Sequence, residues 1–113
     1  MTTVMVEPGA CGFRTKITAL GSDDSSEVTL RVSSGCGAVQ GMMEALGSTF
    51  DAYALCLSKP GKGPFYDYAG EHFPGHAACP VIAGITKCAE AECGLALKRD
   101  ATIHFVNDAG DDA

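Results

Sequence analysis

The chain has 113 residues, of which 46% are hydrophobic, and this is enough for one domain with a hydrophobic core. Its net charge of −6 excludes nucleic acid and anionic membrane surfaces as partners, because both require clustered Lys and Arg. Residues 1–10 lack the features of a signal peptide, and no window approaches the roughly 20 apolar residues of a membrane span. We therefore expect a cytoplasmic protein, in which cysteines are reactive, metal-binding or core thiols rather than disulfides.

The first third of the chain predicts three strands. Residues 2–6 are β-branched, residues 14–20 alternate in polarity, and residues 27–33 alternate more clearly, with Val28, Leu30 and Val32 on one side. A polar turn centred on Asp23 and Asp24 separates the second segment from the third. These two segments therefore predict an antiparallel hairpin.

The rest of the chain predicts helices on that sheet. Apolar residues at helical spacing follow Cys36 and end at Gly47, which predicts the first helix. We expect a second helix over residues 49–57 and a structured loop with one helical turn over 59–75. The longest helix is predicted over 79–97, with Pro80 at its first position. Residues 102–106 predict a last strand, and residues 107–113 an acidic flexible tail.

These elements predict one α+β domain over residues 1–106. It should contain a mostly antiparallel sheet of three to four strands, with helices packed on one face.

Three cysteines stand where predicted elements begin or end. Cys11 and Cys36 are equally distant from the polar turn, so a hairpin would bring them to the same end of the sheet, and Cys79 opens the longest helix. A thiol at a helix start is favoured as thiolate, which is the form that binds zinc or iron. We therefore predict a shared metal site, with backbone space around it from three adjacent glycines, namely Gly12, Gly35 and Gly37.

His76 and Cys56 are further candidate ligands. His76 precedes Cys79 by three residues, and imidazole with thiolates suits zinc or an iron–sulfur cluster. Cys56 is a weaker candidate in the middle of the chain. Cys88 fits the buried stripe of the long helix, and neither it nor Cys93 can share a mononuclear site with Cys79 if that helix is regular.

The residues around the three cysteines resemble the iron–sulfur scaffold family of IscU and the NifU N-terminal domain. The similar segments are Ala10-Cys11-Gly12, Ser34-Gly35-Cys36-Gly37-Ala38, and Cys79 at a helix start. The resemblance covers residues 9–87 and implies an IscU-like fold with the three cysteines as ligands. The pattern departs from that family at Phe13, where the scaffolds have an aspartate. The whole chain also resembles a small uncharacterised cysteine-rich family, a domain of unknown function.

The predicted function is that of a small protein that holds zinc or an iron–sulfur cluster through Cys11, Cys36 and Cys79. It would act as a cluster carrier or specialised scaffold, with a protein that donates or accepts the cluster as partner. Two alternatives remain open: a thiol-based carrier of persulfide sulfur, and a binding module whose cysteines are structural. No P-loop, GxGxxG, HExxH or CxxC motif is present, so the sequence points to no particular reaction and favours a protein that is not an enzyme.

Overall fold

The strands form one antiparallel sheet whose spatial order follows their order along the chain. The computed structural model describes residues 1–107. Within that range the strands are β1 (Thr2–Val6), β2 (Thr15–Gly21), β3 (Glu27–Ser34) and β4 (Thr49–Asp51), and the helices are α1 (Gly37–Leu46), α2 (Ala52–Cys56), α3 (Pro64–His72) and α4 (Val81–Glu92). The predicted α+β fold with a mostly antiparallel sheet is confirmed.

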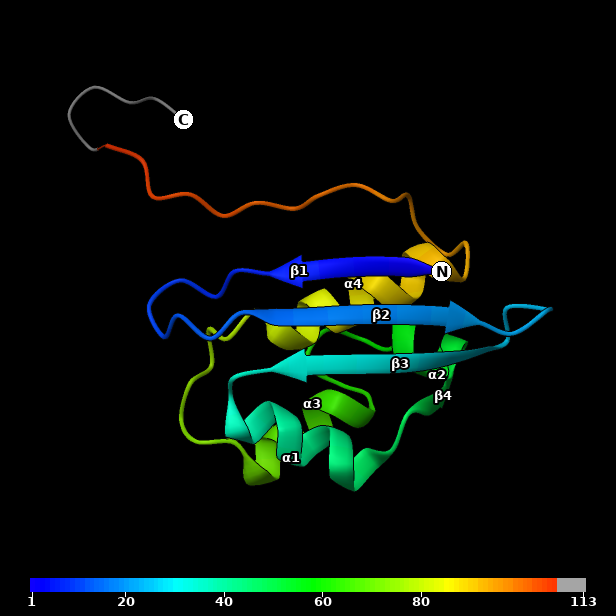
Figure 1. Cartoon of the computed structure of the whole chain (residues 1–113), viewed down its shortest axis with the longest axis horizontal. Coiled ribbons are helices and arrows are strands. Elements are labelled where there is room, and N and C mark those ends of the chain that lie inside the picture. Colours follow the sequence, from blue (N-terminus) through cyan, green and yellow to red (C-terminus); the bar gives the residue numbers. More distant parts are fainter. Residues whose placement is uncertain (108–113) are drawn as a thin grey trace.

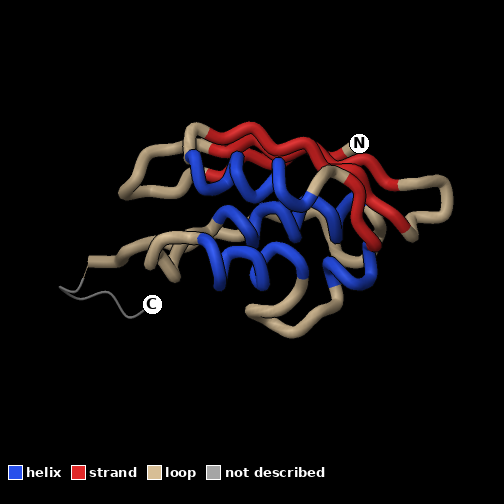
Figure 2. The backbone as a smooth tube through the Cα atoms, turned by 90° about the horizontal axis from the view of Figure 1, so that it is seen from below, coloured by secondary structure: helices blue, strands red, loops and turns tan. Residues whose placement is uncertain are grey.

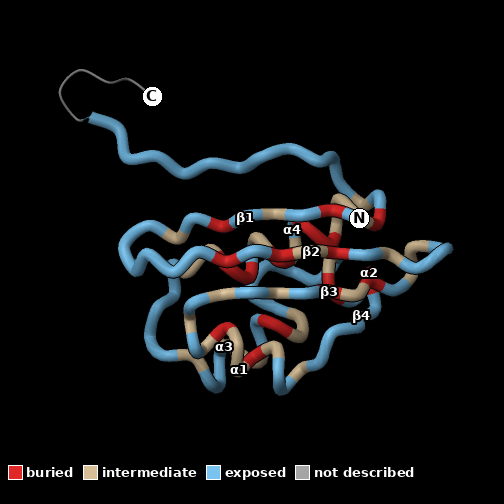
Figure 3. The backbone as a smooth tube through the Cα atoms, viewed as in Figure 1, coloured by how far each residue is buried: buried red, intermediate tan, exposed pale blue. Residues whose placement is uncertain are grey.

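The four helices cover one face of the sheet (Figures 1 and 2). In α4, Ile85, Cys88 and Ala89 are completely buried, and this helix packs on β1 and β2. The core side of the sheet carries Ile17 and Ala19 from β2, which alternate with half-buried or exposed positions as the sequence predicts. In Figure 3 the buried positions lie on the strands and on the helices that cover them.

The hairpin of β2 and β3 has the register that the polar turn predicts. Thr15 pairs with Ser34 at one end and Gly21 with Val28 at the other, next to the turn. On the other side of β2, Val6 pairs with Thr15. The end of β1, the start of β2 and the end of β3 therefore lie at one end of the sheet.

The middle of the chain differs from the sequence prediction. Residues 49–57 form β4 followed by the short helix α2, because the carboxylate of Asp51 accepts a hydrogen bond from Ala54 N–H at 2.9 Å and caps a new helix there. The predicted loop over 59–75 contains the nine-residue helix α3, which begins with Pro64 at a position where the missing N–H costs nothing.

The longest helix is shorter than predicted at both ends. Cys79 lies outside it, and Pro80 is its N-cap. At the other end Gly94 has a φ of 72°, and its N–H and that of Leu95 donate to the carbonyls of Ala91 and Glu90. This pairing is a Schellman motif, so the helix ends at Glu92 and not at residue 97.

The predicted last strand over residues 102–106 is wrong. Residues 98–107 have no regular structure, and Ile103 and Phe105 are 92% and 105% exposed. In Figure 3 this stretch runs exposed along its length. Alternating polarity is typical of a strand, but a strand also needs a neighbouring strand to pair with, and residues 102–106 have none within residues 1–107. Of the predicted acidic tail, residues 108–113 lie outside the described residues.

Candidate functional site

Three connecting segments meet at the end of the sheet where β1 and β3 finish. The loop 7–14 with Cys11 joins β1 to β2, and the turn with Cys36 joins β3 to α1. The connection 73–80, with Cys79, reaches the same end before α4 begins (Figure 1, left). Hairpin symmetry predicted this placement for the first two segments.

Cys36 is held by a chain of hydroxyl hydrogen bonds. Buried Thr15 donates its O–H to Ser34 Oγ at 2.7 Å, and the same Oγ accepts the Cys36 N–H at 3.1 Å. The side-chain amide nitrogen Nε2 of Gln40 donates to the Ser34 carbonyl at 3.0 Å and ties α1 to the same point. Cys36 is the N-cap residue of α1, and its side chain makes no capping hydrogen bond. Cys36 is half-buried beside the start of the helix.

Phe13 links the Cys11 loop to the Cys36 turn. A Cβ added to Gly35 would lie 3.0 Å from Phe13 Cδ1, so the aromatic ring packs directly on the glycine backbone. At Gly12 and Gly37, by contrast, a Cβ would meet nothing within 4 Å. The ring therefore occupies the space at one of the three predicted glycines and leaves the other two open.

Cys79 and His76 lie on one short turn. The Cys79 N–H donates to the His76 carbonyl at 3.3 Å. Both residues line a hollow of about 320 Å³, whose walls include Phe73 and Tyr66. These two candidate ligands are therefore brought to one cavity, as their spacing in the sequence suggested.

The four candidate ligands at this end do not form a finished coordination sphere. Within residues 1–107, no group of three or more His, Cys, Asp or Glu side chains is arranged to hold a metal ion. Cys11 is exposed, whereas Cys36 and Cys79 are half-buried, and all three are free thiols. Cys56 follows β4, whose Asp51 pairs with Glu27 at the opposite end of β3, so it lies apart from the other candidates.

Burial raises the pKa of the other three thiols. Desolvation raises the pKa of Cys56 to about 11, with smaller contributions from Cys93 and Glu90. Desolvation is also the main cause of the raised pKa of Cys88 and Cys93. Cys88 Sγ donates to the Thr2 carbonyl at 3.3 Å inside the core, as expected for a structural cysteine. These three side chains are held as thiols at neutral pH.

Sequence reasoning missed the residues that position the cysteines. Thr15, Ser34 and Gln40 carry no metal-binding chemistry, so no motif singles them out. Phe13 was noted as a departure from the scaffold pattern, but its packing on Gly35 was not predicted. A signal was present in Thr15 and Ser34, because hairpin symmetry predicts polar partners facing each other at the end of the two strands.

A family model described as a family of unknown function (DUF6951) matches residues 2–105. The chain belongs to this family. The matched range of DUF6951 begins with β1 and includes all six cysteines. No curated protein and no solved structure matches the chain. In residues 1–107 of this DUF6951 member, no helix is long and apolar enough to cross a membrane.

Proposed function

We propose that this protein binds zinc or an iron–sulfur cluster through Cys11, Cys36 and Cys79, with His76 as a fourth ligand. The observation that carries the proposal is the arrival of three cysteine-bearing segments at one end of the sheet. The other three thiols lie elsewhere, and burial raises the pKa of each of them. The division of six cysteines into these two groups suits a metal site better than six structural thiols.

The chemistry of these candidate ligands fits both zinc and an iron–sulfur cluster. Thiolates and imidazole are the usual ligands of tetrahedral zinc, and thiolates hold iron–sulfur clusters. Because the ligands are not yet assembled within residues 1–107, binding would draw the exposed loop 7–14 and the connection 73–80 towards Cys36. Metal binding would therefore be coupled to ordering of this end of the molecule.

A cluster carrier or specialised scaffold is the role we propose for the site. The resemblance of the three cysteine segments to the IscU and NifU scaffolds supports it, and so does a sheet with helices on one face. Phe13 stands where those scaffolds have an aspartate and packs on Gly35, which closes part of the space near Cys36. A role in holding or passing on a cluster received from a partner protein is therefore favoured over assembly from free iron and sulfide.

Anaerobic purification tests the proposal. We expect the wild-type protein to contain zinc, or iron with acid-labile sulfide, in a fixed ratio to protein, and a cluster would add visible absorption bands. The triple variant C11S/C36S/C79S should lose the metal. Cys56→Ser is the matched control, because Cys56 is half-buried like Cys36 and Cys79 but lies away from the site, and it should keep the metal.

Two outcomes would overturn the proposal. One is wild-type protein that carries and takes up no metal or cluster under anaerobic conditions, and the other is full metal content in the triple variant. Circular dichroism of the triple variant separates loss of ligands from loss of fold.

The alternative role is transfer of persulfide sulfur, favoured by the position of Cys79 on a hollow beside His76. The Cys79 thiolate would attack the outer sulfur of a donor persulfide, form a Cys79 persulfide and release the donor thiol. Mass spectrometry of metal-free protein after incubation with a small-molecule persulfide donor checks it. Added sulfur confined to Cys79, together with an absence of metal binding, would select this role.

A further inference from the structure

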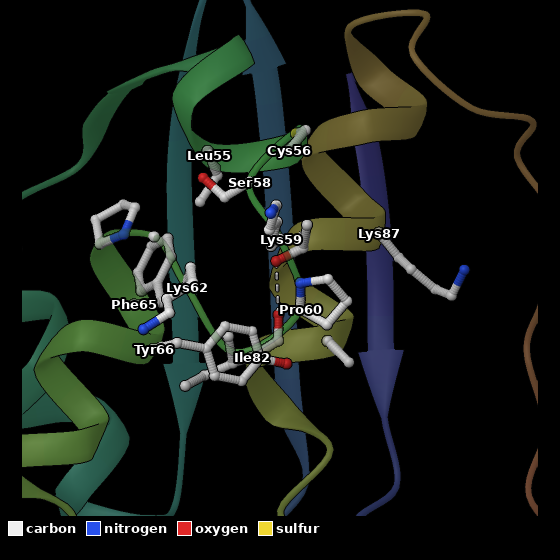
Figure 4. A pocket seen from close by; sticks show the side chains of 14 residues that line it. Leu55, Cys56, Ser58, Lys59, Pro60, Lys62, Phe65, Tyr66, Ile82 and Lys87 are labelled. Carbon is white, nitrogen blue, oxygen red and sulfur yellow. Dashed lines mark hydrogen bonds between the residues drawn. The ribbon is translucent and has the colours of Figure 1, made fainter.

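A second hollow, of about 220 Å³, lies on the helical side of the molecule. It shares Tyr66 and Ile82 with the hollow at Cys79, but none of Cys11, Cys36 and Cys79 lines it. It opens between the end of α2, the connection 57–63, the first turn of α3 and one side of α4 (Figure 4). Its apolar walls include Leu55, Phe65 and Ile82, which are 5%, 1% and 5% exposed and belong to the core. The walls are therefore fixed by packing, as in a preformed ligand site.

A tight turn places two lysines at the rim of this hollow. The Lys62 N–H donates to the Lys59 carbonyl at 2.9 Å, Pro60 follows Lys59, and Gly61 has a φ of 81°. Proline at the second position and a left-handed glycine at the third are the signature of a type II turn. Because such a turn brings the Cα atoms of its first and fourth residues close together, Lys59 and Lys62 start from neighbouring points of the rim, and their side chains then diverge (Figure 4).

The charge of the side chains that line the rim is positive. Three lysines and no acidic residue line the hollow, although the chain as a whole has a net charge of −6. Within residues 1–107, neither Lys59 nor Lys62 forms a salt bridge. Lys87 differs from them, because its ammonium lies 3.7 Å from Glu90 and points away from the other lining residues in Figure 4.

The start of α3 adds little to this positive potential. Gly63 is the N-cap of the helix and supplies no side-chain cap, and Pro64 and Phe65 of the first turn line the hollow. Asp67 also lies in the first turn, and its carboxylate offsets the positive end of the helix dipole. The positive charge at the hollow is therefore carried by the two lysines.

We propose that this hollow binds a small organic anion, with its apolar body between Leu55, Phe65 and Ile82 and its carboxylate or phosphate at Lys59 and Lys62. A volume of 220 Å³ holds about seven waters at ~30 Å³ each, which suits an anion with a single ring or a short alkyl chain. This inference concerns a separate site and does not depend on metal binding.

Benzoate and phenyl phosphate are the probes for the test, and benzamide is the neutral comparator. They are titrated into ¹⁵N-labelled full-length, metal-free protein in phosphate-free buffer of low salt, with amide chemical shifts as the readout. We expect both anions to shift residues 58–66 and 82–87 with Kd on the order of 1 mM. Benzamide should bind at least about tenfold more weakly, and added salt should weaken the anions only.

Lysine variants locate the anion. K59Q/K62Q should raise the Kd for benzoate about tenfold, whereas the matched control K87Q, at the same hollow but paired with Glu90, should leave it nearly unchanged. Equal binding of benzoate and benzamide, shifts that map elsewhere, or no binding by either anion at about ten times the expected Kd would overturn the proposal. Because the comparison of anion and amide uses wild-type protein, it decides the question without reliance on a variant.

Discussion

Glu92 is the residue that fastens α4 to the ends of two strands. Its Oε1 accepts the Thr2 hydroxyl at 2.7 Å, and its Oε2 accepts the Gly21 N–H at 3.0 Å. The Glu92 side chain is only 13% exposed. The Gly21 N–H and then the Thr2 hydroxyl lower the pKa of this carboxyl below its usual value of 4.5.

Glu92→Gln should therefore destabilise the protein at neutral pH and flatten its acid dependence. A lowered pKa in the folded state stabilises the fold above the unfolded pKa, and this stability is lost as the pH falls through the folded pKa. Replacing the charged acceptor should cost about 1–2 kcal/mol at pH 7, and the difference from wild type should shrink below about pH 4. Urea unfolding at several pH values measures both effects.

Glu90→Gln is the control on the same helix. Glu90 forms a surface ion pair with Lys87 at 3.7 Å, so its loss should change the free energy of unfolding by less than about 1 kcal/mol at any pH. Equal pH profiles for Glu92→Gln and Glu90→Gln would contradict the role assigned to Glu92.

At the scale of elements, α4 contacts β1 at Gly84, where the absence of a side chain lets the helix come close to the strand. A Cβ added to Gly84 would overlap Val6 Cγ2 and lie 3.5 Å from Ile17 Cδ1. Val6 is β-branched and 8% exposed, so its side chain has little freedom to move aside. Gly84 therefore sets how closely the longest helix approaches the sheet.

Gly84→Ala should destabilise the fold by about 1–3 kcal/mol, because overpacking outweighs the gain in helix propensity. The matched variant Gly41→Ala lies in α1, where a Cβ would meet nothing within 4 Å, and it should stabilise by up to about 1 kcal/mol. Denaturant unfolding measures both changes. Adding Val6→Ala to Gly84→Ala should recover part of the loss, and failure to recover any of it would contradict the contact with Val6.

The sequence predicted elements well where polarity alternates or repeats with a local stop signal. The spacing of Val28, Leu30 and Val32 predicted β3, and Gly47 ended α1 correctly. Prediction failed where the secondary structure depends on a neighbouring strand or on a residue that caps a helix. Residues 102–106 have the pattern of a strand and no strand to pair with, while the Asp51 cap divides residues 49–57 into β4 and α2.

The sequence predicted which end of the sheet carries the candidate site, but it did not predict how far apart the thiols lie. Equal spacing around the Asp23–Asp24 turn placed the Cys11 and Cys36 segments at one end. The conformation of loop 7–14 depends on the packing of Phe13 on Gly35, a contact between residues 22 positions apart that no local pattern encodes. The hollow at Lys59 was missed because its walls come from three separate helices.

At the scale of the whole molecule, the fold is stabilised without covalent cross-links. All six cysteines lie within residues 1–107 and are free. Stability therefore comes from the core between the sheet and the helices, whose largest completely buried side chains include Ile17, Met42 and Ile85.

Reductant should consequently leave the stability of the metal-free protein unchanged. The thermal midpoint should be the same with and without dithiothreitol in the presence of a chelator, and iodoacetamide should alkylate all six cysteines in denaturant without prior reduction. A native disulfide would instead show as a loss of about 2–5 kcal/mol on reduction and as unmodified cysteines in the mass spectrum.

Tyr66 separates the two hollows and contributes to the wall of each. The chain has three tyrosines and no tryptophan, so its ultraviolet emission comes from tyrosine alone. One native fluorophore therefore lies beside both the His76–Cys79 turn and the Lys59–Lys62 rim. A ligand in either hollow would change the surroundings of that phenol ring, so tyrosine emission would report the occupation of both hollows without any added dye.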